Sequence, residues 1–430
     1  MLDRFKLAER GTCVRTEVMA GCTTFLAVMY IIIVNPTMLS QAGMDFGGTF
    51  IATILASLAG MIGMGLGANL PIAAAPGLGT TAYFVYTVVI SQGVPWQEAL
   101  GASFIASVIF AVLCCTKLLS ALMYAIPDSL KHGITAGLGL FIAIIGMENG
   151  HVLIGNPTTV VAFGNIFNDP MTFLSILGLI VTCILMANGK QSAIFFGMLT
   201  IGVVAYVMGF LELPAAPFAV PDGLDKTFAQ MSFGNINTIL VVSFLLIFIT
   251  VFNAMSAILG ISTQAGLVKE DGVVPGYDGA MLSTAGGSVL GALLGTPPLT
   301  AFAESATGVA AGGRTGVSTL VTALLFLLML FCLPVVKSLS ALTAMAAPAL
   351  IIVGFLMISD IRSLDWNNMV ESFPAFVAML AMPLSYSVTT GLGAGFIAYV
   401  LLKVGTGKFR DVNLLVYCLA LIFFAQFVFF

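Results

Sequence analysis

The feature that most constrains this chain is a series of apolar runs, each long enough to cross a lipid bilayer. A helix needs roughly 20 apolar residues to span the ~30 Å hydrocarbon layer, and only helices or closed barrels satisfy the backbone there. These runs predict an all-α polytopic membrane protein. They lie at 17–38, 48–68, 71–91, 99–116, 132–148, 170–187, 191–212, 236–262, 279–296, 298–315, 317–336, 342–359, 372–385 and 388–404.

Composition excludes several other classes of protein. The chain is 59% hydrophobic and only 8% charged, whereas soluble domains carry about 25% charged residues. No large aqueous domain fits, and without a basic tract nucleic acid is not an expected partner. The sequence shows no metal-ligand spacing, phosphate loop or catalytic set of side chains. We therefore expect neither a metal, nor a cofactor, nor an enzyme.

Two predicted spans are interrupted by Pro and Gly at matching places. The third span opens with Asn-Leu-Pro-Ile-Ala-Ala-Ala-Pro-Gly-Leu-Gly at 69–79, and the tenth opens with Gly-Thr-Pro-Pro at 295–298. Paired interruptions indicate an inverted repeat with its binding site where the repeats meet. Seven spans in each half predict a 7+7 inverted repeat, because an odd number reverses the orientation of the second half. Two unrelated helix kinks are the alternative.

Charge placement predicts the orientation in the membrane. Arg4, Lys6, Arg10 and Arg15 put the amino terminus in the cytoplasm, because basic residues favour that side. Lys403, Lys408 and Arg410 also fall on the cytoplasmic side, provided that 372–385 and 388–404 are two short crossings rather than one long one. The final apolar run, 412–430, is surplus to the repeat and is either a further crossing or a helix at the interface.

Glu304 is the most informative single residue, because it lies between apolar runs where a carboxylate is costly. A charge at membrane depth is rare and usually marks a substrate or ion pathway. A carboxylate accepts hydrogen bonds from ring N–H groups, and it can carry a proton because burial favours its neutral form. Glu304 is therefore the predicted substrate-binding and proton-coupling residue. The alternative is that it satisfies backbone donors freed by the helix break.

Polar residues in the eighth span and at the two breaks complete the predicted pocket. Thr250 and Asn253 are three residues apart, so they share a helix face; a hydrogen bond between helices is the alternative role for Asn253. Helix amino termini are expected near Thr80 and Thr300, with free N–H donors facing each other. The aromatic rings of Tyr83 and Phe302 can stack on a flat ring of the solute, although plain packing is the alternative for both. The further candidate contacts are Gly77, Gly79, Thr81, Tyr83 and Phe302.

The stretch Glu-Ser-Ala-Thr-Gly-Val-Ala-Ala-Gly-Gly-Arg-Thr-Gly at 304–316 is the most specific motif of the chain. Further motif segments are 16–26, 34–36, 68–71, 75–77, 266–267, 270–272, 372–376 and 403–411. Together these segments resemble the AzgA-like purine permeases, the adenine and guanine/hypoxanthine carriers of the nucleobase/ascorbate transporter superfamily. The resemblance runs from about residue 16 to residue 411.

The resemblance implies a uracil-permease-like fold with a core domain and a gate domain. The base would lie between the two breaks and against the eighth span, with Glu304 as the binding carboxylate and Phe302 and Ala303 beside it. The chain departs from the family where Asn253 replaces the usual acid of the eighth span. The implied core is 1–118 and 236–336, the gate 119–215 and 337–404, the linker 216–235 and the surplus apolar segment 405–430.

Together these observations predict a secondary active transporter in a bacterial inner membrane that imports a purine base with a proton. Its expected partners are the base, the proton and membrane lipid, and a homodimer stays open. One alternative is a carrier or uniporter on the same fold for another nucleobase-like ring or a small anion. A membrane sensor that transports nothing is the alternative from another class, although a sensor needs a soluble output domain.

Overall fold

The computed structural model describes residues 2–116, 126–190, 192–269 and 273–429. Within this described part, nine helices are long and apolar enough to cross a membrane, and shorter apolar helices accompany them. The chain is therefore a multi-pass helical membrane protein, as predicted. The motif at 270–272 and the expected domain boundary at 118/119 lie outside the described residues.

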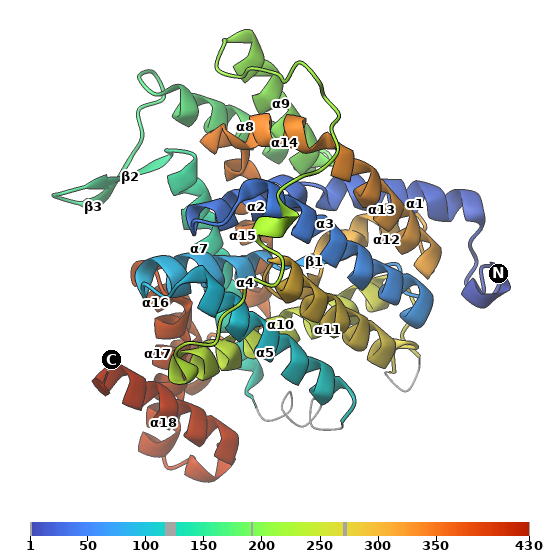
Figure 1. The fold of residues 1–430 in the computed structure, drawn as a ribbon. Coiled ribbons are helices and arrows are strands. Elements are labelled where there is room, and N and C mark those ends of the chain that lie inside the picture. The colour runs from blue at the N-terminus through green and yellow to red at the C-terminus, as the bar shows by residue number, and fades with distance from the viewer. Residues whose placement is uncertain (1, 117–125, 191, 270–272, 430) are drawn as a thin grey trace.

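One set of helices packs together and contains both breaks (Figure 1). We call it the core group. Its apolar side chains and small residues allow close helix contacts, the usual basis of packing in a membrane. Its main helices are α1 (Val14–Val28), α2 (Ile31–Gln41), α3 (Phe46–Ile62) with η2 (Gly63–Ala68), α5 (Trp96–Cys114), α10 (Ile236–Gln264), α11 (Tyr277–Leu294) and α13 (Gly316–Met329).

A second set, which we call the gate group, packs mainly within itself. The runs at 372–385 and 388–404 are two separate helices, and a Cβ on Gly391 would lie 2.1 Å from Met382 Cγ across their contact. Glycine is thus required for this close approach. The group comprises α7 (Asp128–Asn149), α8 (Pro170–Ala187), α9 (Ala193–Val207), α15 (Ala347–Ile358), α16 (Met369–Leu384) and α17 (Val388–Gly405).

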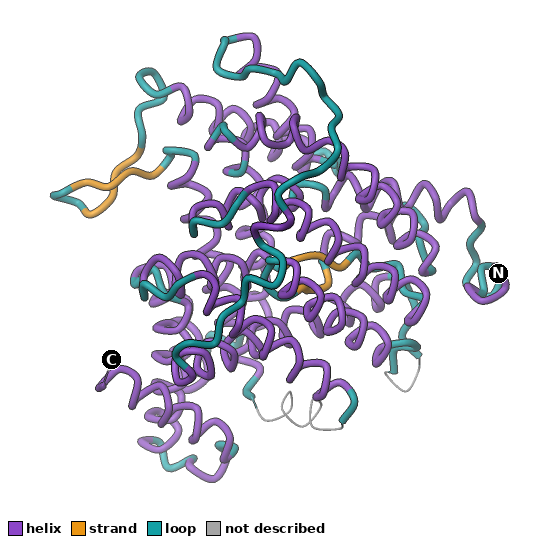
Figure 2. The backbone as a smooth tube through the Cα atoms, in the orientation of Figure 1, coloured by secondary structure: helices purple, strands orange, loops and turns teal. Residues whose placement is uncertain are grey.

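The two breaks form a short antiparallel ribbon in the middle of the bundle, drawn in orange at the centre of Figure 2. Strands β1 (Ala74–Pro76) and β4 (Leu299–Ala301) pair so that Ala75 lies opposite Thr300. Half-helices follow: α4 (Leu78–Ala82) with η3 (Tyr83–Ser91), and η5 (Ala303–Ser305) with α12 (Ala306–Ala310). The pairing satisfies backbone groups that would otherwise be bare at membrane depth.

The second half-helix therefore begins at Ala303, whereas the sequence placed its start near Thr300. The prediction was wrong because 299–301 is extended and paired to the other break. The Pro298 carbonyl accepts a hydrogen bond from the Gly77 N–H at 3.2 Å, which joins the two breaks just before β4.

We call the face that carries the amino terminus the amino-terminal face. Motif residues on this face link distant segments of the core group. The buried Glu17 carboxylate accepts hydrogen bonds from the N–H groups of Arg314 (2.8 Å) and Ser318 (3.2 Å). Asn69, at φ +52°, accepts one from the Gly316 N–H at 2.8 Å. Residues 314–316 therefore have a structural role, because a carboxylate stabilises a helix amino terminus.

The opposite face carries the hairpin of β2 (Leu153–Asn156) and β3 (Val160–Phe163), and we call it the hairpin face. The surplus apolar segment forms α18 (Leu414–Phe429), which packs on α17 through stacked Phe396 and Phe423 rings 5.8 Å apart. The remaining elements are η1 (Leu2–Phe5), η4 (Leu224–Lys226), η6 (Leu330–Cys332), α14 (Leu333–Ser340), η7 (Thr343–Met345), η8 (Ser359–Ser363) and η9 (Phe409–Asp411).

Candidate functional site

A cavity of about 360 Å³ lies between the two breaks, α10 and the gate helices α7 and α15. This volume is within the ~300–1,000 Å³ range of small-molecule sites. It combines apolar walls with a few polar groups, the usual make-up of a site for a flat polar ring. Of the residues predicted from sequence, the cavity brings together Gly77, Gly79, Asn253, Thr300, Phe302, Ala303 and Glu304.

The other predicted contacts lie outside the cavity lining. The Thr80 hydroxyl donates to the carbonyls of Gly77 and Pro298, at 2.8 and 3.0 Å, so it fastens the two breaks together. Thr81, Thr250 and Tyr83 are fully buried and do not line the cavity. Sequence spacing could not separate these residues from the cavity lining, because that separation depends on how the half-helices are rotated.

Glu304 lies in the first turn of the second half-helix and is half-buried. The Tyr30 hydroxyl donates to Glu304 Oε1 at 2.7 Å, and the Tyr30 ring lies 6.3 Å from that of Phe302. Tyr30 occupies the junction between α1 and α2 and lines the same cavity. One carboxylate oxygen is thus fixed by the protein, which leaves Oε2 as the acceptor for a bound solute.

Asn253 faces the first half-helix across the cavity. A Cβ on Gly79 would lie 3.5 Å from Asn253 Nδ2 and 2.4 Å from Leu138 Cδ2, so Gly79 allows both α10 and α7 to approach. Within the described part of the chain, the Asn253 amide has no hydrogen-bonding partner from the protein. The hydrogen bond between helices, considered as an alternative from sequence, is therefore not formed, and the amide can donate and accept toward a solute.

The amino-terminal turns of both half-helices line the cavity, through Leu78 and Gly79 on one side and Ala303 and Glu304 on the other. The first N–H groups of a helix lack intrahelical acceptors, and the helix end carries partial positive charge. These turns can donate to carbonyl or ring-nitrogen acceptors of a solute, while Glu304 accepts from its donors. The site thus offers both kinds of hydrogen-bonding group.

Asn35 holds the two breaks in register from behind the ribbon. Its Nδ2 donates to the Thr53 and Thr296 hydroxyls at 2.7 and 3.1 Å, and its Oδ1 accepts from the Thr81 hydroxyl at 2.7 Å. The side chain is fully buried with both ends paired, so it is structural rather than solute-binding. The sequence analysis quoted it only within the motif at 34–36.

Further residues extend the cavity toward the amino-terminal face. Ser256 and Gln264 line it on α10, Thr135 lines it near the start of α7, and Met357 lines it near the end of α15. The cavity therefore opens toward the face that carries the amino terminus. Helical spacing from Asn253 could have found Ser256 and Gln264, because steps of three and eleven residues return to one helix face.

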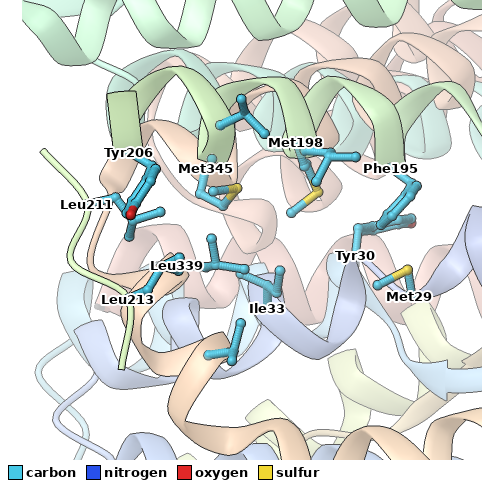
Figure 3. Close-up of a pocket in the computed structure, with 14 residues that line it drawn as sticks. Met29, Tyr30, Ile33, Phe195, Met198, Tyr206, Leu211, Leu213, Leu339 and Met345 are labelled. Carbon is cyan, nitrogen blue, oxygen red and sulfur yellow. The ribbon is translucent and has the colours of Figure 1, made fainter. Parts of the chain in front are cut away.

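A second cavity of about 330 Å³ lies between α1 and α2 of the core group and α9 and α14 (Figure 3). Apolar side chains such as Ile33, Met198, Leu339 and Met345 face one another across it. It lacks the convergence of polar groups found around Glu304, so the first cavity is the candidate solute site. Tyr30 lines both cavities. Among the described residues, no group of His, Cys, Asp and Glu is placed to hold a metal ion.

Known proteins resemble this chain along nearly its whole length. A profile described as "Permease family" matches residues 15–394. The guanine/hypoxanthine permease PbuO of Bacillus subtilis is 39% identical over 98% of this chain and 99% of its own. The adenine permease AdeP of Escherichia coli is 38% identical over 100% of this chain and 96% of its own.

Solved structures share the fold at low sequence identity. The transmembrane domain of the cyanobacterial bicarbonate transporter BicA superposes with a TM-score of 0.63 at 14% identity, covering 88% of this chain and 96% of its own. SLC26A9 gives a TM-score of 0.62 at 13% identity, covering 91% of this chain and 66% of its own. These neighbours confirm the predicted all-α polytopic membrane fold.

Proposed function

This chain belongs to the Permease family, which makes it a membrane transporter rather than an enzyme, and we propose that it carries a purine nucleobase with a proton. The observation that carries the proposal is the cavity between the breaks, where Glu304 and Asn253 offer complementary hydrogen-bonding groups to a flat ring. Relatives at 38–39% identity are named for guanine, hypoxanthine and adenine. A purine ring presents N–H donors for the carboxylate and acceptors for the amide and the helix ends.

The proposal extends to the mechanism of transport. The core group and the gate group, as 1–118 with 236–336 and 119–215 with 337–404, move against each other around the bound base. The two halves are related as a 7+7 inverted repeat, with the amino terminus in the cytoplasm. With that orientation the cavity opens to the cytoplasm in this structure, and Glu304 carries the proton because it is the carboxylate that lines the cavity.

A small anion is the second candidate solute, because the fold is shared with a bicarbonate transporter. The half-helix amino termini suit an anion, but Glu304 beside them repels one. No lysine or arginine lines the cavity among the described residues. The chemistry of the cavity therefore favours a neutral ring over an anion.

Uptake of labelled hypoxanthine, guanine, adenine and uracil by cells that lack their own carriers tests the proposal. We expect purine uptake that a protonophore reduces and that Glu304→Gln abolishes. Glu212→Gln is the matched control, since Glu212 is exposed in the segment before α10 and away from the cavity. Uptake of purines by Glu304→Gln at the native rate, in protein shown to reach the membrane, would defeat the assignment.

A further inference from the structure

Hydrogen bonds join the core group to the gate group on the hairpin face, opposite the mouth of the cavity. The Tyr86 hydroxyl of η3 donates to Gln41 Oε1 at 2.7 Å and accepts from Asn149 Nδ2 at 3.4 Å. Gln41 Nε2 in turn donates to Asn149 Oδ1 at 3.3 Å. Close by, the Tyr386 hydroxyl, in the turn between α16 and α17, donates to Glu148 Oε2 at the end of α7.

Three aromatic rings close the same seam beneath these hydrogen bonds. Tyr86 and Tyr386 meet edge to face with ring centroids 6.1 Å apart, and Phe141 of α7 lies 5.4 Å from Tyr386. Edge-to-face pairs of this kind are favourable contacts. Tyr386 has φ +54°, a backbone conformation that residues other than glycine rarely adopt. We call Gln41, Tyr86, Phe141, Glu148, Asn149 and Tyr386 the hairpin-face cluster.

Between the cluster and the cavity lie three buried hydroxyls that lack a hydrogen-bonding partner of good geometry in the described part of the chain. They belong to Tyr83, Thr250 and Thr389, and the Tyr83 and Thr389 hydroxyls have only a weak contact with each other. Tyr83 is four residues beyond Gly79 on the first half-helix, and Thr250 is three residues before Asn253 on α10, so each continues a wall of the cavity toward the hairpin face. Thr389 opens α17 and lies beside Tyr83.

Buried polar groups without partners are costly and rare, and each requires an explanation. A path that is closed in one state and open in another supplies it, because water or solute then satisfies the hydroxyls. We propose that the seam between η3 and the turn joining α16 to α17 is the second half of the solute path, closed here by the hairpin-face cluster. This inference rests on the proposed transport function and adds the route that the base takes on the other side.

Accessibility of Thr389 tests the route without any substrate. In a background whose native cysteines are replaced by serine, Thr389→Cys is labelled with a membrane-impermeant maleimide from the hairpin face. Thr159→Cys, exposed in the β2–β3 turn, identifies that face and calibrates full labelling. Adding Tyr86→Phe or Tyr386→Phe removes hydroxyls of the cluster and is expected to raise labelling of Thr389→Cys at least ~5-fold. Labelling that stays at its original level in both variants would overturn the proposal.

A cross-link tests whether the seam must open for transport. Gln41→Cys with Asn149→Cys, joined by a short bifunctional thiol reagent, is expected to lose at least ~10-fold of its purine uptake and to regain it after reduction. Purified cross-linked protein should still bind the base, because the cavity opens to the other face. Each single-cysteine variant is the control. Uptake that persists in fully cross-linked protein would contradict the route. If labelling of Thr389→Cys rises as expected but the parent protein takes up no purine, only the proposed function is contradicted.

Discussion

Replacing Tyr30 by Phe removes one oxygen from the candidate site and leaves the ring that packs near Phe302. That oxygen donates to Glu304 Oε1 at 2.7 Å. A hydrogen bond to a charged group contributes about 1.5–3 kcal/mol. Glu304 is half-buried against an open cavity, so water can replace part of the lost bond. We therefore expect a loss near the lower limit, about 1.4 kcal/mol, which is a tenfold weaker affinity for the base.

Equilibrium binding of the preferred base to purified protein measures this effect. Tyr417→Phe is the matched control, because the Tyr417 hydroxyl donates to the Phe409 carbonyl at 2.9 Å, far from the cavity, and its removal should leave affinity unchanged. Thermal unfolding of both variants shows whether Tyr30→Phe acts on stability instead. Native affinity in a well-folded Tyr30→Phe protein would refute the argument that Tyr30 orients the binding carboxylate.

Three further changes have defined outcomes. Asn253→Asp places a second carboxylate at the cavity with Glu304, so base affinity should depend more strongly on pH between about 5 and 8 than in the parent, measured by binding; parallel curves would count against a shared site. Gly79→Ala should lower purine uptake at least ~10-fold, because its Cβ would lie 2.4 Å from a side chain of gate helix α7; native uptake would show that this contact is not needed. Burial raises the pKa of Asp45, but hydrogen bonds from Lys226 and the Gly48 N–H outweigh it and hold the pKa below its ordinary 3.8. The stability from this pair is then present above that value and lost as pH falls through the lower folded pKa. Because asparagine does not titrate, the stability of Asp45→Asn should fall less than that of the parent as the pH drops below about 4, which thermal unfolding measures.

Much of the candidate site could be predicted from local sequence. Glu304 and Asn253 stand out because a charge or an amide is costly inside an apolar run, and Gly77 and Gly79 stand out because they interrupt one. Each of these signals depends only on neighbouring residues. The cavity lining contains all four.

Other parts of the site depend on contacts between residues far apart in the chain. Tyr30 meets Glu304 across 274 residues, and Asn35 meets Thr296 across 261. Nothing near Tyr30 distinguishes it from an aromatic residue facing lipid. For the same reason Tyr83 was expected in the pocket, although the structure packs it in the seam between the core and gate groups.

The sequence by itself determined the membrane environment, the helices, the two breaks and the residues that are costly in an apolar setting. Hydropathy and helix breaking act over one or two turns, so they are legible without tertiary structure. Only the tertiary structure decided that the breaks pair as β-strands, that the cavity opens toward the amino-terminal face and that the hairpin face is closed. Those properties are set by how distant helices rotate and pack against one another, and packing depends on complementary shapes that no local pattern specifies.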